Sequence, residues 1–241
     1  MARDKIVGIL GGMGPESTVD FFLKLIKATP AQKDQEHLRI IIDNNPKIPD
    51  RTLALLGKGE SPLKELKRTI RNLEKAGAEL IAMPCNTVYA YYDELQKSSH
   101  IPIINMISET IEYVQRKFPD IKKIGLLATT GTVKAGTYHK ATREIEIITP
   151  DEVAQEKVMS AIYSAQGIKA GHREYPRREI LEVAEVLIEQ GAEAIIIGCT
   201  ENSLSLNQGD FPLPLIDPLQ ILAGVAIKNA KIKDHIKHWA I

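Results

Sequence analysis

Two stretches of the chain, Gly77–Thr87 (GAELIAMPCNT) and Gly191–Thr200 (GAEAIIIGCT), repeat one pattern. In each, a Gly-Ala-Glu turn leads into a short apolar run that ends close to a cysteine, and the two stretches keep a constant offset of 114 residues. A short apolar run between turn residues is typical of a buried strand in a parallel sheet. The repeat therefore predicts two related halves, each with a cysteine at the carboxyl end of a strand.

Two further matches support this duplication. Val7–Leu10 and Ile124–Leu127 are strand-like runs with a glycine at the second position, and their offset is 117 residues. Pro102 and Pro214 each precede two apolar residues, with an offset of 112. One such match could arise from α/β composition alone, but three at nearly the same offset indicate an internal repeat.

Short apolar runs alternate with longer amphipathic stretches, as in βα units. We expect strands at Ile6–Leu10, Leu38–Ile42, Leu80–Met83, Ile101–Ile104, Lys123–Leu127, Glu144–Ile148, Ala194–Ile197 and Pro214–Ile216, with a polar loop from Asp43 to Pro46. We expect helices at Ser17–Lys27, from Ser61-Pro62 to Lys75, at Glu156–Ala165 and at Arg178–Glu189. The predicted fold is α/β, with two pseudo-symmetric lobes that each contain a mainly parallel sheet flanked by helices, and an active site in the cleft between them. Residues 1–105 with 212–241 are expected to form the N-terminal lobe, and residues 106–211 the C-terminal lobe.

The composition excludes several classes of protein. Lys plus Arg and Asp plus Glu both number 31, so no overall basic field suggests nucleic acid as a partner. The basic stretch Lys228–His238 is interpreted as a solvated helix end. No run approaches the roughly 18 apolar residues of a membrane span, and the N-terminus lacks the pattern of a signal peptide. We therefore expect a cytoplasmic protein with two reduced cysteines.

The two cysteines are the main candidates for chemistry. Carboxyl ends of parallel strands form the ligand-binding edge of α/β sheets, and a pseudo-twofold axis would place Cys85 and Cys199 on opposite sides of one cleft. Such a pair suits removal of a proton from one face of a carbon and its return on the other face. A single strand-end cysteine is more often a small apolar filler, but two at equivalent positions favour a catalytic role. Neither has a second Cys or His at ligand spacing, so no metal is expected.

Five motifs carry a resemblance to a known family. They are Gly8–Pro15, Asn44–Thr52, Met83–Thr87, Leu127–Thr132 and Gly198–Glu201. With these motifs the chain resembles the aspartate/glutamate racemase superfamily, and specifically its aspartate racemase branch. The resemblance implies an isomerase that racemises a small amino acid, aspartate with glutamate as a second candidate, through two cysteines and without pyridoxal phosphate or another cofactor. It also implies a homodimer.

Carried over residue by residue, the resemblance assigns a role to each matching position. Cys85 and Cys199 take the place of the catalytic thiols, and Arg51 falls where the side-chain carboxylate of the substrate is clamped. Lys169 resembles a position that closes over the substrate, and Met13 would line the cleft. The residues expected to hold the α-carboxylate and amino group are Asn86, Thr87, Thr129, Thr132 and Thr200. Glu201, directly after Thr200, is included among the substrate-binding candidates because its backbone N–H lies where a helix would begin.

One position departs from the family pattern. The family commonly reads Cys-Asn-Thr-Ala-His, whereas this chain has Tyr89 at the last of these positions. A phenol titrates near 10 and is neutral at pH 7, so Tyr89 would act on the first thiol differently from a histidine.

Three alternatives stay open on sequence alone. A related isomerase of the same superfamily could act on another dicarboxylate. A non-catalytic protein of the same fold could bind an amino acid with inert cysteines. A dehydrogenase could use Asp43 to bind a ribose, although the glycine turn Gly8–Pro15 lacks the G-x-G-x-x-G spacing.

Overall fold

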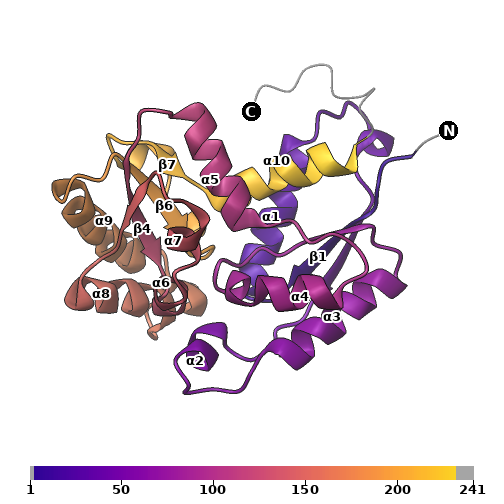
Figure 1. Cartoon of the computed structure of the whole chain (residues 1–241), viewed down its shortest axis with the longest axis horizontal. Helices are drawn as coiled ribbons and strands as arrows, with labels where there is room; N and C mark the ends of the chain where they lie inside the picture. Colours follow the sequence, from indigo (N-terminus) through magenta and orange to yellow (C-terminus); the bar gives the residue numbers. More distant parts are fainter. Residues whose placement is uncertain (1–2, 232–241) are drawn as a thin grey trace.

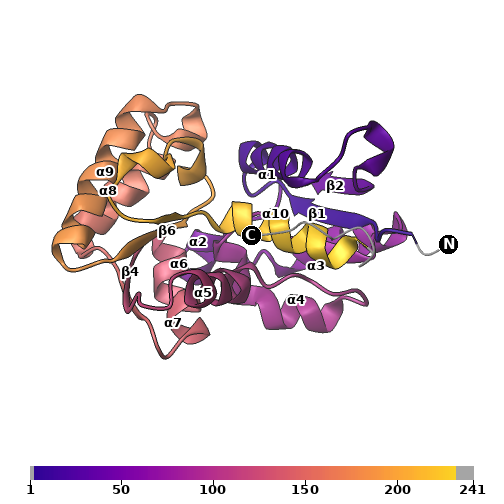
Figure 2. The same ribbon diagram turned by 90° about the horizontal axis from the view of Figure 1, so that it is seen from above.

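The computed structural model describes residues 3–231, which form two α/β lobes side by side (Figures 1 and 2). The first sheet has the order β2 (Ile40–Asn44), β1 (Val7–Gly11), β3 (Leu80–Ala82). The second has the order β5 (Glu146–Ile148), β4 (Lys123–Ala128), β6 (Ala194–Gly198), β7 (Leu215–Ile216). All strand pairs are parallel, and in each lobe the first strand lies between the second and the third. The prediction of two pseudo-symmetric α/β lobes is confirmed.

Helices flank both sheets and connect the strands. The first half contains α1 (Pro15–Ala28), η1 (Asp34–Glu36), α2 (Arg51–Leu55), α3 (Leu63–Lys75), η2 (Thr87–Tyr91), α4 (Tyr92–Ser98) and α5 (Met106–Lys117). The second half contains α6 (Thr130–Ala135), α7 (Thr137–Ala141), α8 (Glu152–Tyr163), η3 (Ile168–Ala170), α9 (Glu174–Glu189), η4 (Asn202–Leu204), η5 (Gln208–Asp210) and α10 (Pro218–Ala230).

The repeated Gly-Ala-Glu turn performs the same structural task in both lobes. Gly77 and Gly191 follow α3 and α9 with φ values of 94° and 92°, a left-handed conformation that glycine adopts without a Cβ penalty. Two residues on, Glu79 accepts a hydrogen bond from the backbone N–H of Ile6 (2.9 Å), and Glu193 accepts one from that of Lys123 (2.9 Å). Each glutamate thus satisfies a backbone donor where the neighbouring central strand begins.

The second sheet is buried on both faces, and one of its faces joins the core of the first lobe. Along β4, Ile124 and Leu126 belong to a buried cluster that also contains Val7 and Ile9 of β1. Leu127 belongs to a separate cluster under α8 and α9. This alternation follows from the period of two in a strand. One hydrophobic cluster therefore spans both lobes, and a second cluster belongs to the second lobe alone.

Several element boundaries differ from the predicted ones. Asp43 and Asn44 were expected in a loop, but they extend β2 and pair with Leu10 and Gly11. Because β2 is an edge strand, its polar side chains can remain partly exposed. The expected strand Ile101–Ile104 is reduced to a single bridge between Ile81 and Ile103, since Pro102 has no N–H to donate.

The expected strand at Glu144 begins only at Glu146, because the Thr142 hydroxyl accepts the backbone N–H groups of Glu144 and Ile145 in a turn. Helix starts were placed too late in three cases. The observed helices begin at Pro15, at Glu152 after the N-cap Asp151, and at Glu174. Helix α3 begins at Leu63, with Pro62 as its N-cap rather than Ser61.

Helices α5 and α10 lie between the lobes (Figure 1). Strand β7 pairs with β6 in the second sheet, so this segment after residue 212 hydrogen-bonds within the second lobe, whereas α10 packs against α1 and α5. The limits 1–105, 106–211 and 212–241 stay a prediction. The expected helix end Lys228–His238 lies mostly outside the described residues, in which α10 ends at Ala230.

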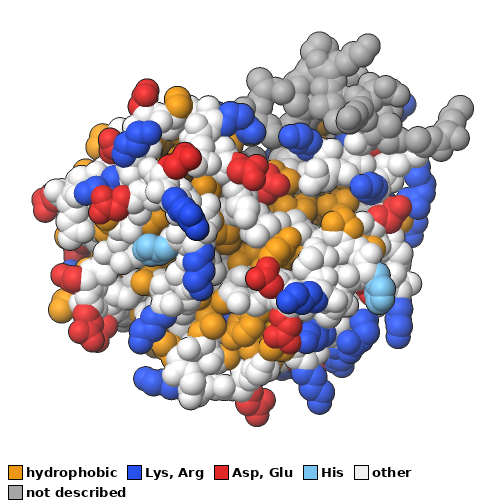
Figure 3. All heavy atoms as spheres, viewed as in Figure 1, with side chains coloured by type: hydrophobic (Ala, Val, Ile, Leu, Met, Phe, Trp, Pro, Cys, Tyr) orange, Lys and Arg blue, Asp and Glu red, His pale blue; other side chains and the backbone are white. Residues whose placement is uncertain are grey.

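The surface carries charges of both signs. Figure 3 shows Lys and Arg side chains interspersed with Asp and Glu, with hydrophobic side chains gathered at the centre of this face. Within residues 3–231, the structure contains no helix that combines the length and the apolar character needed to cross a membrane.

Candidate active site

Both cysteines lie at carboxyl ends of equivalent strands. Cys199 follows β6 directly, and Cys85 follows β3 after a tight turn in which its N–H donates to the Met83 carbonyl (2.8 Å). Each is followed by a short 3-10 helix, η2 or η4. Both are free thiols, and each side chain is 4% exposed. Equal burial means that their chemical difference comes from their neighbours.

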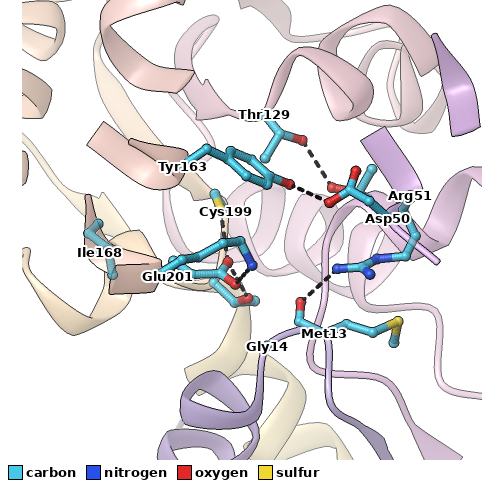
Figure 4. A network of polar contacts seen from close by, with 12 residues as sticks. Met13, Gly14, Asp50, Arg51, Thr129, Tyr163, Ile168, Cys199 and Glu201 are labelled. Atoms are coloured by element: carbon cyan, nitrogen blue, oxygen red, sulfur yellow. Dashed lines mark hydrogen bonds and ion pairs between the residues drawn. The ribbon is translucent and has the colours of Figure 1, made fainter. Parts of the chain in front are cut away.

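Cys199 lies beside an ion pair in which Glu201 is buried and Lys169 is partly exposed. Its Sγ is 3.1 Å from Oε2 of Glu201, and Oε1 of Glu201 is 2.6 Å from Nζ of Lys169 (Figure 4). Burial, and then the Glu201 charge, raise the pKa of the Cys199 thiol well above its usual value. Burial also acts to raise the pKa of Glu201, but the Lys169 ammonium outweighs it and lowers the pKa. Glu201 is therefore ionised and Cys199 protonated at neutral pH.

Arg51 is buried and lies beside Cys85. It is the first residue of α2, 7% exposed, and its guanidinium donates to the carbonyls of Pro49 (3.2 Å) and Met13 (3.3 Å). Burial opposes the charged form, but the interaction with Cys85 and then with Asp50 raises the Arg51 pKa. Within the described part of the chain, its buried Nε has no hydrogen-bond partner. Arg51 is therefore a buried cation with one N–H available to a ligand.

Three threonine hydroxyls join the lobes. Thr87 follows Cys85, whereas Thr129 and Thr132 lie at the start of α6 in the second lobe. Oγ1 of Thr87 is 3.0 Å from Oγ1 of both Thr129 and Thr132, and these two are 3.1 Å apart. Thr129 is also the N-cap of α6, since its hydroxyl accepts the Thr132 N–H (3.3 Å). The structure therefore brings three of the expected substrate-binding residues together.

Asn86 and Thr200 flank the same region. The Tyr138 hydroxyl donates to Oδ1 of Asn86 (2.6 Å), whereas Nδ2 of Asn86 is buried without a partner among the described residues. Thr200 donates its hydroxyl to Oε2 of Glu201 (3.2 Å). A buried donor without an acceptor costs free energy, so Asn86 Nδ2 and Arg51 Nε mark positions that an acceptor such as a carboxylate would satisfy.

A cavity of about 350 Å³ lies beside Arg51, and its lining contains neither Cys85 nor Cys199 and none of the threonines described above. Its walls include Met13, Arg51 and Lys169, three of the residues expected to bind substrate. Gly14 lies against the ion pair, because a Cβ at this position would be 3.3 Å from Oε1 of Glu201. A larger cavity of about 400 Å³ is lined in part by Tyr92, Asn105 and Lys140, and its lining includes neither cysteine.

Asp50 and Tyr163 line the cavity but were not predicted from the sequence as site residues. Tyr163, at the end of α8, points its hydroxyl toward Asp50, and the two oxygens are 3.1 Å apart (Figure 4). Asp50 also caps α2 by accepting the Leu53 N–H (2.8 Å). The Lys169 ammonium lies 5.3 Å from the centre of the Tyr163 ring. The sequence separation of 113 residues between Tyr163 and Asp50 leaves no local signal for this contact.

Tyr89 supports the strand end that carries Cys85. Its buried hydroxyl lies 3.2 Å from the Met83 carbonyl and 3.0 Å from the Ile104 carbonyl, and it donates to these acceptors. Burial raises the pKa of Tyr89 far above its usual value. Tyr89 is therefore a neutral donor to backbone, and not a proton carrier.

The chain belongs to the Asp/Glu/hydantoin racemase family, whose model matches residues 10–226. It is 30% identical over 230 residues to the broad specificity amino-acid racemase RacX of Bacillus subtilis, covering 90% of this chain and 95% of the relative. The structure is similar to that of the Picrophilus torridus aspartate racemase, with a TM-score of 0.83, 33% identity, and coverage of 95% and 96% of the two chains. It is also similar to an aspartate racemase homologue from Pyrococcus horikoshii, with a TM-score of 0.73, 25% identity, and coverage of 94% and 99%. The family is one of amino-acid racemases, and therefore of isomerases.

Proposed function

We propose that the protein interconverts L- and D-aspartate, with glutamate as a second substrate, by a two-thiol reaction without pyridoxal phosphate or a metal. The observation that carries this proposal is the buried Arg51 guanidinium, which lies beside Cys85, lines the cavity and keeps one N–H without a partner. A dicarboxylate would supply the missing acceptor through a charge-assisted hydrogen bond.

In the proposed reaction, one cysteine thiolate removes the α-proton from one face of the substrate. The resulting carbanion is stabilised by delocalisation into its carboxylate, and the other cysteine donates its thiol proton to the opposite face. The first sulfur ends protonated and the second ends as a thiolate, so protons balance and the reverse direction exchanges the roles. Arg51 would bind the side-chain carboxylate, and Lys169 would close over the substrate. The α-carboxylate and amino group would be bound by Asn86, Thr87, Thr129, Thr132 and Thr200, with Glu201 beside them.

Incubation of the purified protein with L-aspartate in D₂O tests this proposal. We expect D-aspartate to form with deuterium at Cα, and we expect Cys85→Ala and Cys199→Ala each to lower the rate by about 10²–10⁴-fold, the usual contribution of a positioned acid or base. Absence of both product and deuterium exchange, with retained aspartate binding, would instead identify a non-catalytic binding protein.

The likeness to a broad specificity racemase raises a second candidate, in which neutral or basic amino acids are also racemised. The Arg51 guanidinium at the cavity keeps an N–H without a partner and favours acidic substrates instead, whereas the Lys169 charge is already paired with Glu201. A panel of aspartate, glutamate, alanine and lysine, compared by kcat/KM, separates the two. Preference for alanine or lysine would contradict the dicarboxylate assignment.

We further propose that the protein is a homodimer in the cytoplasm, where its thiols would stay reduced. Sedimentation velocity of the reduced protein measures the assembly, and a single monomeric species across micromolar concentrations would refute it.

A further inference from the structure

The two cysteines have neighbours of opposite charge, although they occupy equivalent positions of the repeat. Two residues after Cys85 the chain has Thr87, whose hydroxyl is bound to Thr129 and Thr132. Two residues after Cys199 it has Glu201, whose carboxylate contacts the sulfur. The charged group beside Cys85 is the Arg51 guanidinium. The two thiols therefore differ in the charge of their neighbours, although they occupy equivalent positions of a pseudo-symmetric fold.

The contact between Cys199 and Glu201 requires a proton on sulfur. Glu201 is ionised because Lys169 lies 2.6 Å from its Oε1, and an ionised carboxylate can only accept hydrogen bonds. At 3.1 Å from Oε2, the Cys199 sulfur must then be the donor. A thiolate at this distance would place two negative charges together in a site where Glu201 is only 6% exposed.

The other charged and titratable groups near the sulfurs do not reverse this difference. Lys169 and Tyr163 also interact with Cys199. The ammonium of Lys169 favours a thiolate there, but it is paired with Glu201, and burial raises the pKa of the Tyr163 phenol so that it is neutral. Near Cys85 the corresponding groups are the Arg51 cation and the neutral Tyr89.

We infer that Glu201 is a positioning residue that keeps the proton on Cys199 in the free protein, so that Cys199 rests as the acid and Cys85, beside Arg51, as the base. This inference rests on the proposed two-thiol function. The resting protein is then prepared for the enantiomer whose α-hydrogen faces Cys85. Enantiomers have equal free energies, so kcat/KM is the same in both directions, and the bias appears in kcat and KM separately.

Titration of single-cysteine variants without substrate tests the inference. Cys85→Ser leaves Cys199 as the only thiol. The ultraviolet absorbance of the thiolate is followed against pH, with and without the Glu201 carboxylate. We expect Cys199 to ionise only at a pH well above the usual thiol range. Adding Glu201→Gln to Cys85→Ser should move the Cys199 titration down by at least about one pH unit, a tenfold gain in thiolate at a given pH, because the carboxylate is lost and the Lys169 charge is left facing the sulfur.

The matched control is Glu182→Gln in the same Cys85→Ser background. Glu182 forms an ion pair with Lys157 at 2.9 Å on the exposed surface of the same lobe, and its replacement should leave the titration unchanged. The inference is overturned if Cys199 ionises in the usual thiol range, or if Glu201→Gln leaves the Cys199 titration where it was. Because no turnover is measured, a protein that fails to racemise any amino acid would refute the proposed function without altering this result.

Discussion

Among single residues, Arg51 is the side chain whose contacts leave the least freedom for substitution. Its guanidinium donates hydrogen bonds to the Pro49 and Met13 carbonyls and lies beside Cys85. We expect Arg51→Lys to lower kcat/KM for aspartate by about 10²-fold, because a lysine ammonium cannot reproduce the planar fork of donors. It should also lower the unfolding free energy by about 1–3 kcal/mol, since buried carbonyls lose their donors. Racemisation assays and urea unfolding measure both effects, with the exposed Arg68→Lys as a control.

Tyr89 allows a prediction in which stability and activity separate. Removal of its hydroxyl in Tyr89→Phe leaves the Met83 and Ile104 carbonyls without this donor. We expect the unfolding free energy to fall by about 1–2 kcal/mol, while kcat/KM changes by less than about tenfold, a loss under 1.4 kcal/mol in the transition state. A large loss of kcat with unchanged stability would show that the phenol takes part in proton transfer.

Residue types and spacing were enough to propose which residues form the candidate site, but not which contacts they make. The repeat alone identified Cys85 and Cys199 as equivalent, and the structure places Arg51 and Lys169 on one cavity. The Tyr163–Asp50 hydrogen bond and the Tyr138–Asn86 hydrogen bond could not be predicted, because each joins residues more than 50 positions apart and neither tyrosine belongs to a motif.

At the scale of elements, two aspartates cap helices in the same way but at different distances from the cavity. Asp50 caps α2 by accepting the Leu53 N–H (2.8 Å), and Asp151 caps α8 by accepting the Ala154 N–H (2.9 Å). Each Asp→Ala change should cost about 1 kcal/mol of stability. Only Asp50→Ala should also raise KM, because α2 begins with Arg51 and Asp50 holds Tyr163. Equal KM values in the two variants would contradict a role for α2 in presenting Arg51.

Element types were predictable, whereas element ends depended on contacts that a sequence does not display. The helix α8 begins four residues before its predicted start because the Asp151 side chain caps it. Asp43 and Asn44 look like loop residues, yet they continue β2 because Leu10 and Gly11 supply backbone partners. Strand pairing and edge position, rather than residue preference, decided these ends.

At the scale of the whole molecule, Asp217 lies where the chain passes from β7 into α10 and forms an ion pair with Lys24 at 3.4 Å. Burial raises the pKa of Asp217 despite this lysine, so the folded state binds a proton more readily than the unfolded chain does. The unfolding free energy of the natural protein should therefore decrease as the pH rises from the ordinary pKa of an aspartate through the raised pKa of Asp217. Asp217→Asn retains an oxygen for the cap at Leu219 but removes this decrease.

Urea unfolding between acidic and neutral pH measures this difference. The stability of Asp217→Asn relative to the natural protein should grow as pH rises. A constant difference across the pH range would show that Lys24 fully offsets the burial of the Asp217 charge.

The hydrophobic core common to both lobes has a consequence for the history and biosynthesis of the chain. Ile124, Leu126 and Ile196 present one face of the second sheet to the cluster that contains Val7 and Ile9. Neither half is expected to fold alone. A fragment ending near residue 105 would expose the first-lobe side of this cluster to water, a fragment beginning there would expose the second-sheet side, and both would tend to aggregate. During synthesis on the ribosome, the core of the first half cannot be completed until the second half has been made. The finished protein should unfold as one cooperative unit.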